Sequence, residues 1–371
     1  MGGACVDKLF FSFWRSGFNL FLCFAGFCTV AGAAQAETIP HQPLPHLALN
    51  PQTITVSGFS SGAFMAVQMH VAHSSLIKGI AVFAGGPFGC ARDQDGIATL
   101  AQATQHCVNV PYLPWWKSFG TFANPPLLSN LEATVHALER ANRIDALHNL
   151  AQDRVVLFSG TRDPIVPLSV MKVLNKWYTS FIPEHQIHSV FTTQAGHGLP
   201  SLEGTVACPD TDTPYLNSCG IDGVGQALPF LLKPYGSTTH EKSHKGGELF
   251  SFSQLPFLPH QNESAGMNDV GYVFVPKMCE KAPGCHLHIA FHGCKQNDAF
   301  TGLSFFTKSG YNTWAEQHGT VVLYPQVRAS FPENSLGCWD WWGYTDQDFL
   351  TREGQQIQSV HAMITRLLTP L

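Results

Sequence analysis

The feature that most constrains the fold is a β-branched run that ends in a glycine-rich turn and continues into a helix. Residues 53–57 (TITVS) predict a strand, and residues 63–72 are good helix formers. Between them, residues 58–62 (GFSSG) have the pattern Gly-x-Ser-x-Gly. In such a strand-to-helix turn the backbone is sharp and the oxygen of the central serine is exposed. The sequence therefore predicts that Ser60 is a nucleophile, with Ser61 as its local competitor.

Strands and helices alternate along most of the chain. This alternation predicts an α/β protein with a mainly parallel sheet and helices on both faces. Residues 88–128 are rich in Pro, Trp and Cys and are expected to form loops over one end of the sheet, whereas residues 236–268 are expected to form a long surface connection. The further predicted strands are 80–84, 154–159, 187–193, 271–276, 286–291 and 320–324, and the further helices are 129–150, 168–179 and 355–368.

The first 36 residues have the features of a secretory signal. Lys8 and Arg15 precede an apolar stretch over 18–31, and small residues lead to a cleavage point after Ala36. The alternative is a membrane anchor, but the apolar stretch is shorter than the roughly 20 residues that a spanning helix needs. We therefore expect a secreted protein, extracellular or periplasmic, with no membrane attachment after cleavage and one catalytic domain over 37–371.

Composition narrows the class of protein further. The chain has 371 residues, of which 44% are hydrophobic and only 13% are charged, and this balance excludes a disordered chain. The formal net charge is −5 and no basic run occurs, so a nucleic-acid partner is not expected.

Eight of the 11 cysteines lie beyond the predicted leader. An even number of cysteines in an exported protein favours disulfides. The alternative is a zinc site, but no CxxC pair or paired histidine spacing occurs, so we expect neither a metal nor a cofactor. Neighbours along the chain suggest the pairs Cys90–Cys107, Cys208–Cys219, Cys279–Cys285 and Cys294–Cys338.

A serine nucleophile needs a base and a group that orients the base. Asp163 follows the predicted strand 154–159, whereas its acidic rivals, Asp145 and Asp153, lie in or beside a helix. His197 stands between two glycines after the predicted strand 187–193, and His292 is the rival base. The order serine, aspartate, histidine along the chain is that of α/β-hydrolases.

An oxyanion hole requires two backbone N–H groups. One belongs to the residue after the nucleophile, here Ser61, and the other normally comes from a His-Gly-Gly-like loop upstream of the nucleophile. A similar stretch, residues 292–296 (HGCKQ), lies downstream instead and offers the N–H of Cys294. This inverted order predicts a circularly permuted α/β-hydrolase fold, in which the helix 355–368 leads into the strand that begins at 53.

The motifs GFSSGAF at 58–64, HGCKQ at 292–296 and CWDWWG at 338–343, with an Asp and a Gly-His-Gly between them, resemble the polyhydroxybutyrate (PHB) depolymerase family. The similarity is greatest to its single-domain, circularly permuted, secreted members and covers roughly residues 48–368. The resemblance implies a serine esterase that cleaves poly(3-hydroxybutyrate) or its oligomers, with Ser60, Asp163 and His197 as the triad. It also implies that a tryptophan contacts the polyester, and Trp339 is the matching residue.

An uncharged polyester suits a cleft lined by aromatic side chains. Trp116, Trp341 and Trp342 fall in predicted loops and are further candidates for substrate contact, although scaffold roles are the alternative. A feruloyl or acetylxylan esterase shares the same serine turn and loop and remains a rival function. A non-catalytic polymer-binding protein is a second rival, which the intact set of three residues opposes. The expected partner is a polyester chain, and the expected oligomeric state is a monomer.

Overall fold

The computed structural model describes residues 39–93, 95–109, 122–233, 246–259, 265–280 and 283–370. These residues belong to one compact unit that begins at Ile39. The predicted leader over 1–36 and Trp116 lie outside the described residues.

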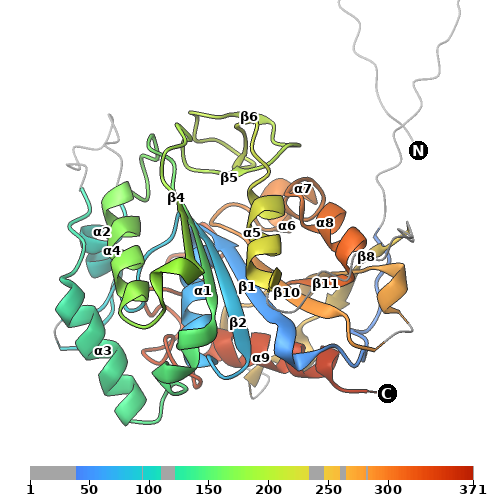
Figure 1. Cartoon of the computed structure of the whole chain (residues 1–371), viewed down its shortest axis with the longest axis horizontal. Coiled ribbons are helices and arrows are strands. Elements are labelled where there is room, and N and C mark those ends of the chain that lie inside the picture. The colour runs from blue at the N-terminus through green and yellow to red at the C-terminus, as the bar shows by residue number, and fades with distance from the viewer. Residues whose placement is uncertain are drawn as a thin grey trace, which may run out of the picture. The chain divides into compact units, whose positions relative to one another are not determined.

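An eight-stranded sheet forms the centre of this unit (Figure 1), in the order β4-β3-β2-β1-β10-β11-β9-β8. Six strands run parallel, while β9 is antiparallel to β11 and β8 is antiparallel to β9. The architecture is therefore the mainly parallel α/β sheet that the sequence predicts. The strands are β1 (Ile54–Phe59), β2 (Ile77–Phe83), β3 (Arg154–Phe158), β4 (Ile187–Val190), β8 (Glu248–Ser253), β9 (Val270–Val275), β10 (His286–Phe291) and β11 (Thr320–Tyr324).

Helices cover both faces of the sheet. Successive residues of a strand point to opposite faces. On β2, the Cβ position of Gly79 faces Leu231 of α5, whereas Val82 lies on the side of Ala63 in α1. The helices are α1 (Ser61–Ala72), α2 (Leu100–His106), α3 (Leu128–Arg140), α4 (Leu168–Thr179), α5 (Gly223–Leu232), α6 (Asp298–Thr301), α7 (Ser304–Lys308), α8 (Tyr311–His318) and α9 (Gln355–Leu368).

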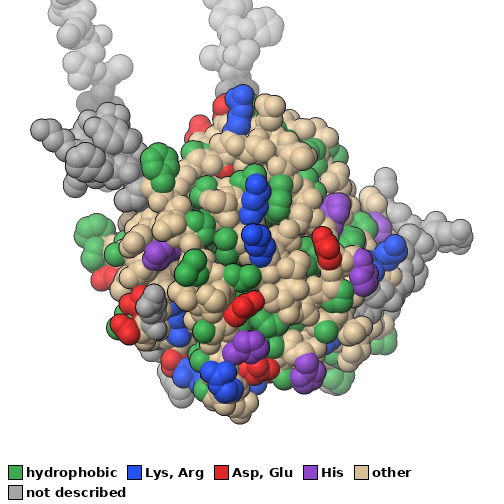
Figure 2. Space-filling view, turned by 60° about the vertical axis from the view of Figure 1, so that its left-hand side comes forward, with side chains coloured by type: hydrophobic (Ala, Val, Ile, Leu, Met, Phe, Trp, Pro, Cys, Tyr) green, Lys and Arg blue, Asp and Glu red, His purple; other side chains and the backbone are tan. Residues whose placement is uncertain are grey.

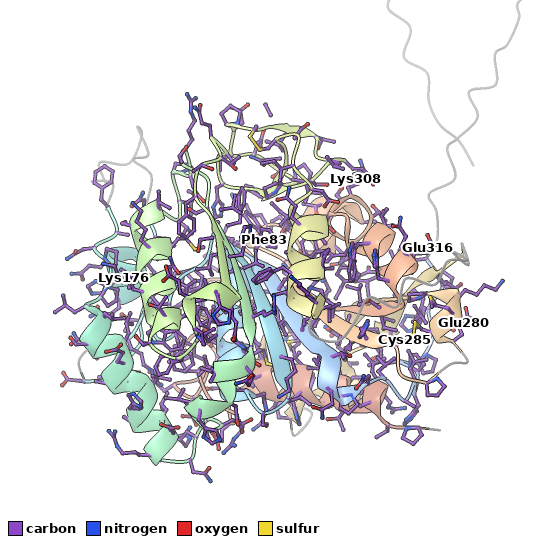
Figure 3. The ribbon with its side chains drawn as sticks, viewed as in Figure 1. Phe83, Lys176, Glu280, Cys285, Lys308 and Glu316 are labelled. Carbon is purple, nitrogen blue, oxygen red and sulfur yellow. A yellow bond between two sulfur atoms is a disulfide. The ribbon has the colours of Figure 1, made fainter. Side chains whose placement is uncertain are left out.

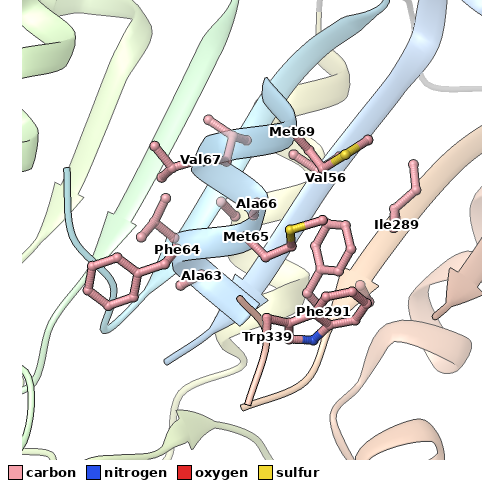
Figure 4. Packing of buried hydrophobic residues seen from close by; sticks show 14 of the residues in the cluster. Val56, Ala63, Phe64, Met65, Ala66, Val67, Met69, Ile289, Phe291 and Trp339 are labelled. Carbon is pink, nitrogen blue, oxygen red and sulfur yellow. The ribbon is translucent and has the colours of Figure 1, made fainter. Parts of the chain in front are cut away.

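Helix α1 is a central part of the hydrophobic core, since all twelve of its residues are buried. Its residues are apolar on almost every side, which is typical of a helix that is covered all round. Figure 4 shows Met65 of α1 toward Phe291 of β10 and Trp339, whereas Phe64 points to the opposite side of the helix. The nucleophile turn at the start of α1 is thus mounted on a rigid, fully packed element.

The expected surface connection over 236–268 is wrong in its middle part. Residues 248–253 form β8, which extends the sheet by pairing with β9. Phe250 and Phe252 point into the core, and this period-two apolar pattern is the signal that the prediction passed over. Two further expectations are corrected: α2 lies within the predicted loops of 88–128, and the helix predicted over 129–150 ends at Arg140.

Both ends of the described unit meet at one edge of the fold. The N–H groups of Leu47 and Leu49 donate to the carbonyl of Leu367 in the last turn of α9, at 3.3 and 3.4 Å. The chain entering β1 therefore lies beside the chain leaving α9. This contact supports the circular permutation, which stays a prediction.

A second, three-stranded sheet lies outside the main one and was not expected from the sequence. Its order is β5-β7-β6, with β5 (Leu199–Pro200), β6 (Val206–Ala207) and β7 (Leu216–Ser218). The Cys208–Cys219 disulfide crosses it, and the other six cysteines form the remaining three pairs that the chain order suggested. Within the described residues, no helix combines the length and the apolar character needed to cross a bilayer.

Candidate active site

Ser60 lies at the tip of the turn between β1 and α1. Its backbone has φ +55° and ψ −122°, a conformation that side-chain-bearing residues rarely adopt, and its N–H donates to the carbonyl of Phe83 at 3.0 Å. Phe83 ends β2 near the centre of the molecule (Figure 3). A Cβ at Gly58 would overlap the carbonyl of Gly62, so only glycine permits this sharp turn. The structure thus reproduces the strained elbow that exposes a nucleophilic oxygen.

A chain of hydrogen bonds connects Ser60 to two groups from distant parts of the sequence. His197 Nε2 lies 2.9 Å from Ser60 Oγ, and His197 Nδ1 lies 2.8 Å from Asp163 Oδ2. All three residues are at least nine-tenths buried. Because a carboxylate accepts, Nδ1 carries the proton and Nε2 is left to accept the proton of the Ser60 hydroxyl.

Asp163 is fixed by the turn that follows β3. Its second carboxylate oxygen, Oδ1, accepts from the N–H groups of Ile165 at 2.8 Å and Val166 at 2.9 Å. The rivals Asp145 and Asp153 lie elsewhere, since they bond to Arg352 and His70 respectively. The carboxylate is therefore oriented on both sides, which leaves Oδ2 for the imidazole.

The loop after β4 that carries His197 is held by the small sheet. The His197 N–H donates to Thr211 Oγ1 at 2.8 Å, and the Gly196 N–H donates to the carbonyl of Cys208 at 2.8 Å. The ring of Phe59 lies against the imidazole, with 4.7 Å between ring centroids. These contacts give the small sheet a clear role, which is to fix the base against the nucleophile turn.

The loop 292–296 lies directly against Ser60. A Cβ on Gly293 would approach Ser60 Cβ to 3.2 Å and Phe59 Cδ1 to 2.7 Å, so this residue must be glycine for the two turns to touch. Neither the Ser61 N–H nor the Cys294 N–H donates a hydrogen bond to any described residue. The Cys294–Cys338 disulfide fastens the loop to the tryptophan-rich segment. The two turns that meet at Ser60 therefore each carry a backbone N–H with no acceptor among the described residues, and such free donors are what an oxyanion hole needs.

The three candidate tryptophans that the structure describes do not line a cleft as expected. Trp339 is completely buried, with its ring 4.9 Å from that of Phe291, and its backbone N–H donates to Ser61 Oγ at 3.3 Å. Trp341 and Trp342 are also buried, and Trp341 stacks on Phe64 at 4.3 Å. The expectation that Trp339 contacts substrate is corrected, since it has no accessible surface here.

Asp340 explains why this loop is drawn into the core, and sequence reasoning missed it. Its buried carboxylate accepts from the N–H groups of Trp342, Gly343, Tyr344 and Thr345. Burial raises the pKa of Asp340, and hydrogen bonds from Thr345, Tyr344 and Gly343 oppose that shift. The only sequence signal for this role of Asp340 is its position in CWDWWG, where a single carboxylate stands among aromatic residues.

His292, the rival base, has a different environment. It is fully buried, its Nδ1 donates to the carbonyl of Gly293 at 2.7 Å, and burial lowers its pKa to about 4. It makes no contact with Ser60 comparable to that of His197. Among the described residues there is no group of three or more His, Cys, Asp or Glu side chains that could hold a metal ion.

The fold and the site define the class, an α/β-hydrolase fold with a serine, histidine and aspartate arranged as a triad. No family model matches the chain. The crystal structure of a PHB depolymerase from Penicillium funiculosum superposes with a TM-score of 0.74 at 29% identity, covering 88% of this chain and 99% of that one. A PHB depolymerase variant complexed with an R3HB trimer gives the same values.

Proteins with similar sequences agree with this structural similarity. A poly(3-hydroxybutyrate) depolymerase of Delftia acidovorans is 34% identical over 329 residues, which are 87% of this chain but 61% of that protein. A polyhydroxybutyrate depolymerase of Talaromyces funiculosus is 29% identical over 91% of this chain and 95% of its own length. Acetylxylan esterase A of Aspergillus ficuum is 29% identical over 127 residues, 34% of each chain. The chain is thus a homologue of PHB depolymerases, and the resemblance seen in its sequence is confirmed.

Proposed function

We propose that the protein is a serine esterase that hydrolyses poly(3-hydroxybutyrate) or its oligomers through an acyl-enzyme on Ser60. The observation that carries this proposal is the continuous hydrogen-bond chain from Ser60 through His197 to Asp163, beside the two amides of Ser61 and Cys294. Similarity to PHB depolymerases over most of the chain supplies the substrate class.

Acylation begins when Ser60 Oγ passes its proton to His197 Nε2 and bonds to the ester carbonyl carbon. The carbonyl oxygen becomes an oxyanion, which the N–H groups of Ser61 and Cys294 stabilise. His197 then gives its proton to the ester oxygen as the C–O bond breaks. A fragment that ends in a hydroxyl leaves, and the acyl part stays on Ser60.

Deacylation repeats these steps with water. His197 takes a proton from the water, whose oxygen attacks the acyl carbon, and the same two amides hold the second oxyanion. The proton then returns to Ser60 Oγ as the acyl–serine bond breaks and the acid is released. Asp163 stays ionised throughout and stabilises the imidazolium that forms in each half-reaction.

Surface character agrees with an uncharged substrate. Only 13% of the residues are charged, and on the face drawn in Figure 2 the charged side chains are scattered among polar and apolar ones. Phe300 and Leu336 are 41% and 43% exposed. Leu336 lies beside the loop 292–296, the oxyanion loop, because the Lys295 N–H donates to the Leu336 carbonyl at 2.7 Å, and Phe300 lies near the next residue, since a Cβ on Gly337 would be 3.5 Å from its ring. In place of Trp339, these two residues are the candidates for contact with the methyl-bearing polyester.

The second candidate function is an acetylxylan-type esterase, favoured by the partial match to Aspergillus ficuum acetylxylan esterase A. Such an enzyme would use the same triad on a smaller acyl group, so the two functions differ only in the substrate that is hydrolysed. A third possibility, a non-catalytic polymer-binding protein, requires that Ser60 fail to react with a fluorophosphonate probe.

Export from the cell forms part of the proposal. Four disulfides persist only where the environment is oxidising. Together with the predicted leader over residues 1–36, they support secretion or release into a periplasm.

The test is incubation of the mature protein with amorphous PHB, crystalline PHB and acetylated xylan. We expect 3-hydroxybutyrate and its oligomers from the amorphous polymer, and none from a Ser60→Ala variant of unchanged circular dichroism. Release of acetate from xylan without release of hydroxybutyrate would replace the proposal by the second candidate.

A further inference from the structure

The backbone carbonyl and N–H of Gly293 are each hydrogen-bonded to a buried side chain that does not belong to the triad. Gln296 is completely buried, and its Oε1 accepts from the Gly293 N–H at 2.8 Å. His292 is also completely buried, and its Nδ1 donates to the Gly293 carbonyl at 2.7 Å. Both polar backbone groups of this glycine are therefore fixed, one by each side chain.

The second of these bonds determines where the Cys294 amide points. The peptide unit that joins Gly293 to Cys294 is trans, since the cis bonds of the described chain lie elsewhere. A trans peptide is planar, so its C=O and N–H point in opposite directions. Because His292 holds the Gly293 carbonyl, the Cys294 N–H must point the opposite way, and Gly293 itself lies against the nucleophile turn, since a Cβ there would be 3.2 Å from Ser60 Cβ.

The hydrogen bonds of His292 define its protonation state. Its Nε2 accepts from the Val327 N–H at 3.4 Å, so the ring must be neutral with its proton on Nδ1. Burial favours the same neutral ring, because it lowers the pKa of His292 to about 4. The donor to Gly293 is thus present at neutral pH.

Gln296 connects this loop to the surroundings of the base. A backbone N–H can only donate and a carbonyl can only accept, so Oε1 faces Gly293 and Nε2 faces the Pro214 carbonyl at 3.0 Å. Pro214 precedes Tyr215, whose ring lies edge-on to that of His197 with 6.5 Å between centroids. One side chain therefore spans the gap between the oxyanion loop and the loop beside the base.

We propose that His292 and Gln296 are positioning residues that aim the Cys294 N–H at the oxyanion. Preorganised donors stabilise a transition state because they need no rearrangement when charge develops. The inference rests on the proposed function, since it assigns a role within the same site. It predicts that loss of either side chain slows the chemical step while substrate binding is retained.

The test measures hydrolysis of the soluble ester p-nitrophenyl butyrate by His292→Leu, His292→Asn and Gln296→Met. Removing an oxyanion donor typically costs about 10²–10³ in kcat, so a misaimed donor should cost about 10- to 100-fold in His292→Leu and Gln296→Met, with KM within about threefold. His292→Asn keeps an N–H donor close to the position of Nδ1 and should recover most of the rate. A trifluoromethyl ketone, which forms an oxyanion on Ser60, should lose affinity in parallel with kcat.

His288→Leu is the matched control. His288 is another completely buried histidine and lies on β10, the strand that leads into His292, but it bonds to Thr55 and Ser57 rather than to the oxyanion loop. It should lower stability and leave kcat unchanged. If His292→Leu does not fold, Gln296→Met, which conserves volume, decides the question alone.

The inference is overturned if the folded His292 and Gln296 variants keep kcat within threefold of the parent, or if His288→Leu loses as much. An inactive parent protein would instead refute the proposed function, so the two failures are distinguishable.

Discussion

Replacement of Asp163 by asparagine should move the proton of His197 from Nδ1 to Nε2 without disturbing the fold. In the parent, Asp163 Oδ1 accepts from the N–H groups of Ile165 and Val166, and Oδ2 accepts from His197 Nδ1. An asparagine that placed its nitrogen at the Oδ1 position would leave two backbone donors unsatisfied, at about 1–3 kcal/mol each. The amide oxygen must therefore stay there, and the nitrogen must face the imidazole.

This orientation disables the base. The asparagine nitrogen can only donate, so His197 Nδ1 must accept and its proton moves to Nε2, the atom 2.9 Å from Ser60 Oγ. A protonated Nε2 cannot take the proton of the hydroxyl. The same change in comparable triads lowers kcat by about 10⁴-fold, which corresponds to about 5 kcal/mol of activation free energy.

The assay is hydrolysis of p-nitrophenyl butyrate at pH 8, together with the thermal midpoint Tm. Asp163→Asn should lose about four orders of magnitude in kcat and keep its Tm, because both backbone hydrogen bonds survive. Asp153→Asn is the matched control, since Asp153 is a buried carboxylate 3.1 Å from a buried histidine, His70, outside the site. It should lower Tm and spare kcat. A folded Asp163→Asn variant with kcat within tenfold of the parent would refute the proposed role of Asp163.

Three further predictions concern the scaffold. Gly62→Ala should abolish ester hydrolysis and lower Tm, because the new methyl would overlap backbone carbonyls at the end of β10. An active variant would show that the nucleophile turn and the loop after β10 do not touch. Asp340→Ala should lower the free energy of unfolding in urea by about 3–5 kcal/mol, because four backbone donors lose their acceptor, and an unchanged midpoint would contradict this. Burial lowers the pKa of His73 to about 4 and that of His288 to about 3, from 6.5. The unfolded chain therefore binds more protons below pH 6.5, so Tm should fall from pH 7 to pH 4, and a flat profile would exclude these groups as the cause.

Local patterns were enough to predict most of the elements. Helices α4 and α9 and strands β10 and β11 have the bounds that their apolar periodicity indicated, because each carries its own pattern and its own breakers. The meeting of Ser60, Asp163 and His197 was also foreseen. Three turns that follow parallel strands must lie at one edge of a sheet, whatever their distance along the chain.

Properties that depend on partners far along the chain could not be predicted. Trp339 is predicted in a loop, but loop position does not decide burial, which here comes with packing against Phe291 of β10. The roles of His292 and Gln296 could not be predicted from the sequence either, because they depend on hydrogen bonds to Gly293 and Pro214 that only the folded chain forms.

Trapping of the covalent intermediate tests the central claim most directly. The protein would be mixed with a short 3-hydroxybutyrate oligomer, quenched in acid within milliseconds and digested for mass spectrometry. The account predicts one or more hydroxybutyryl units on the peptide that contains Ser60, and none in the Ser60→Ala variant. Ester hydrolysis with no adduct on that peptide, or with an adduct on another residue, would contradict it.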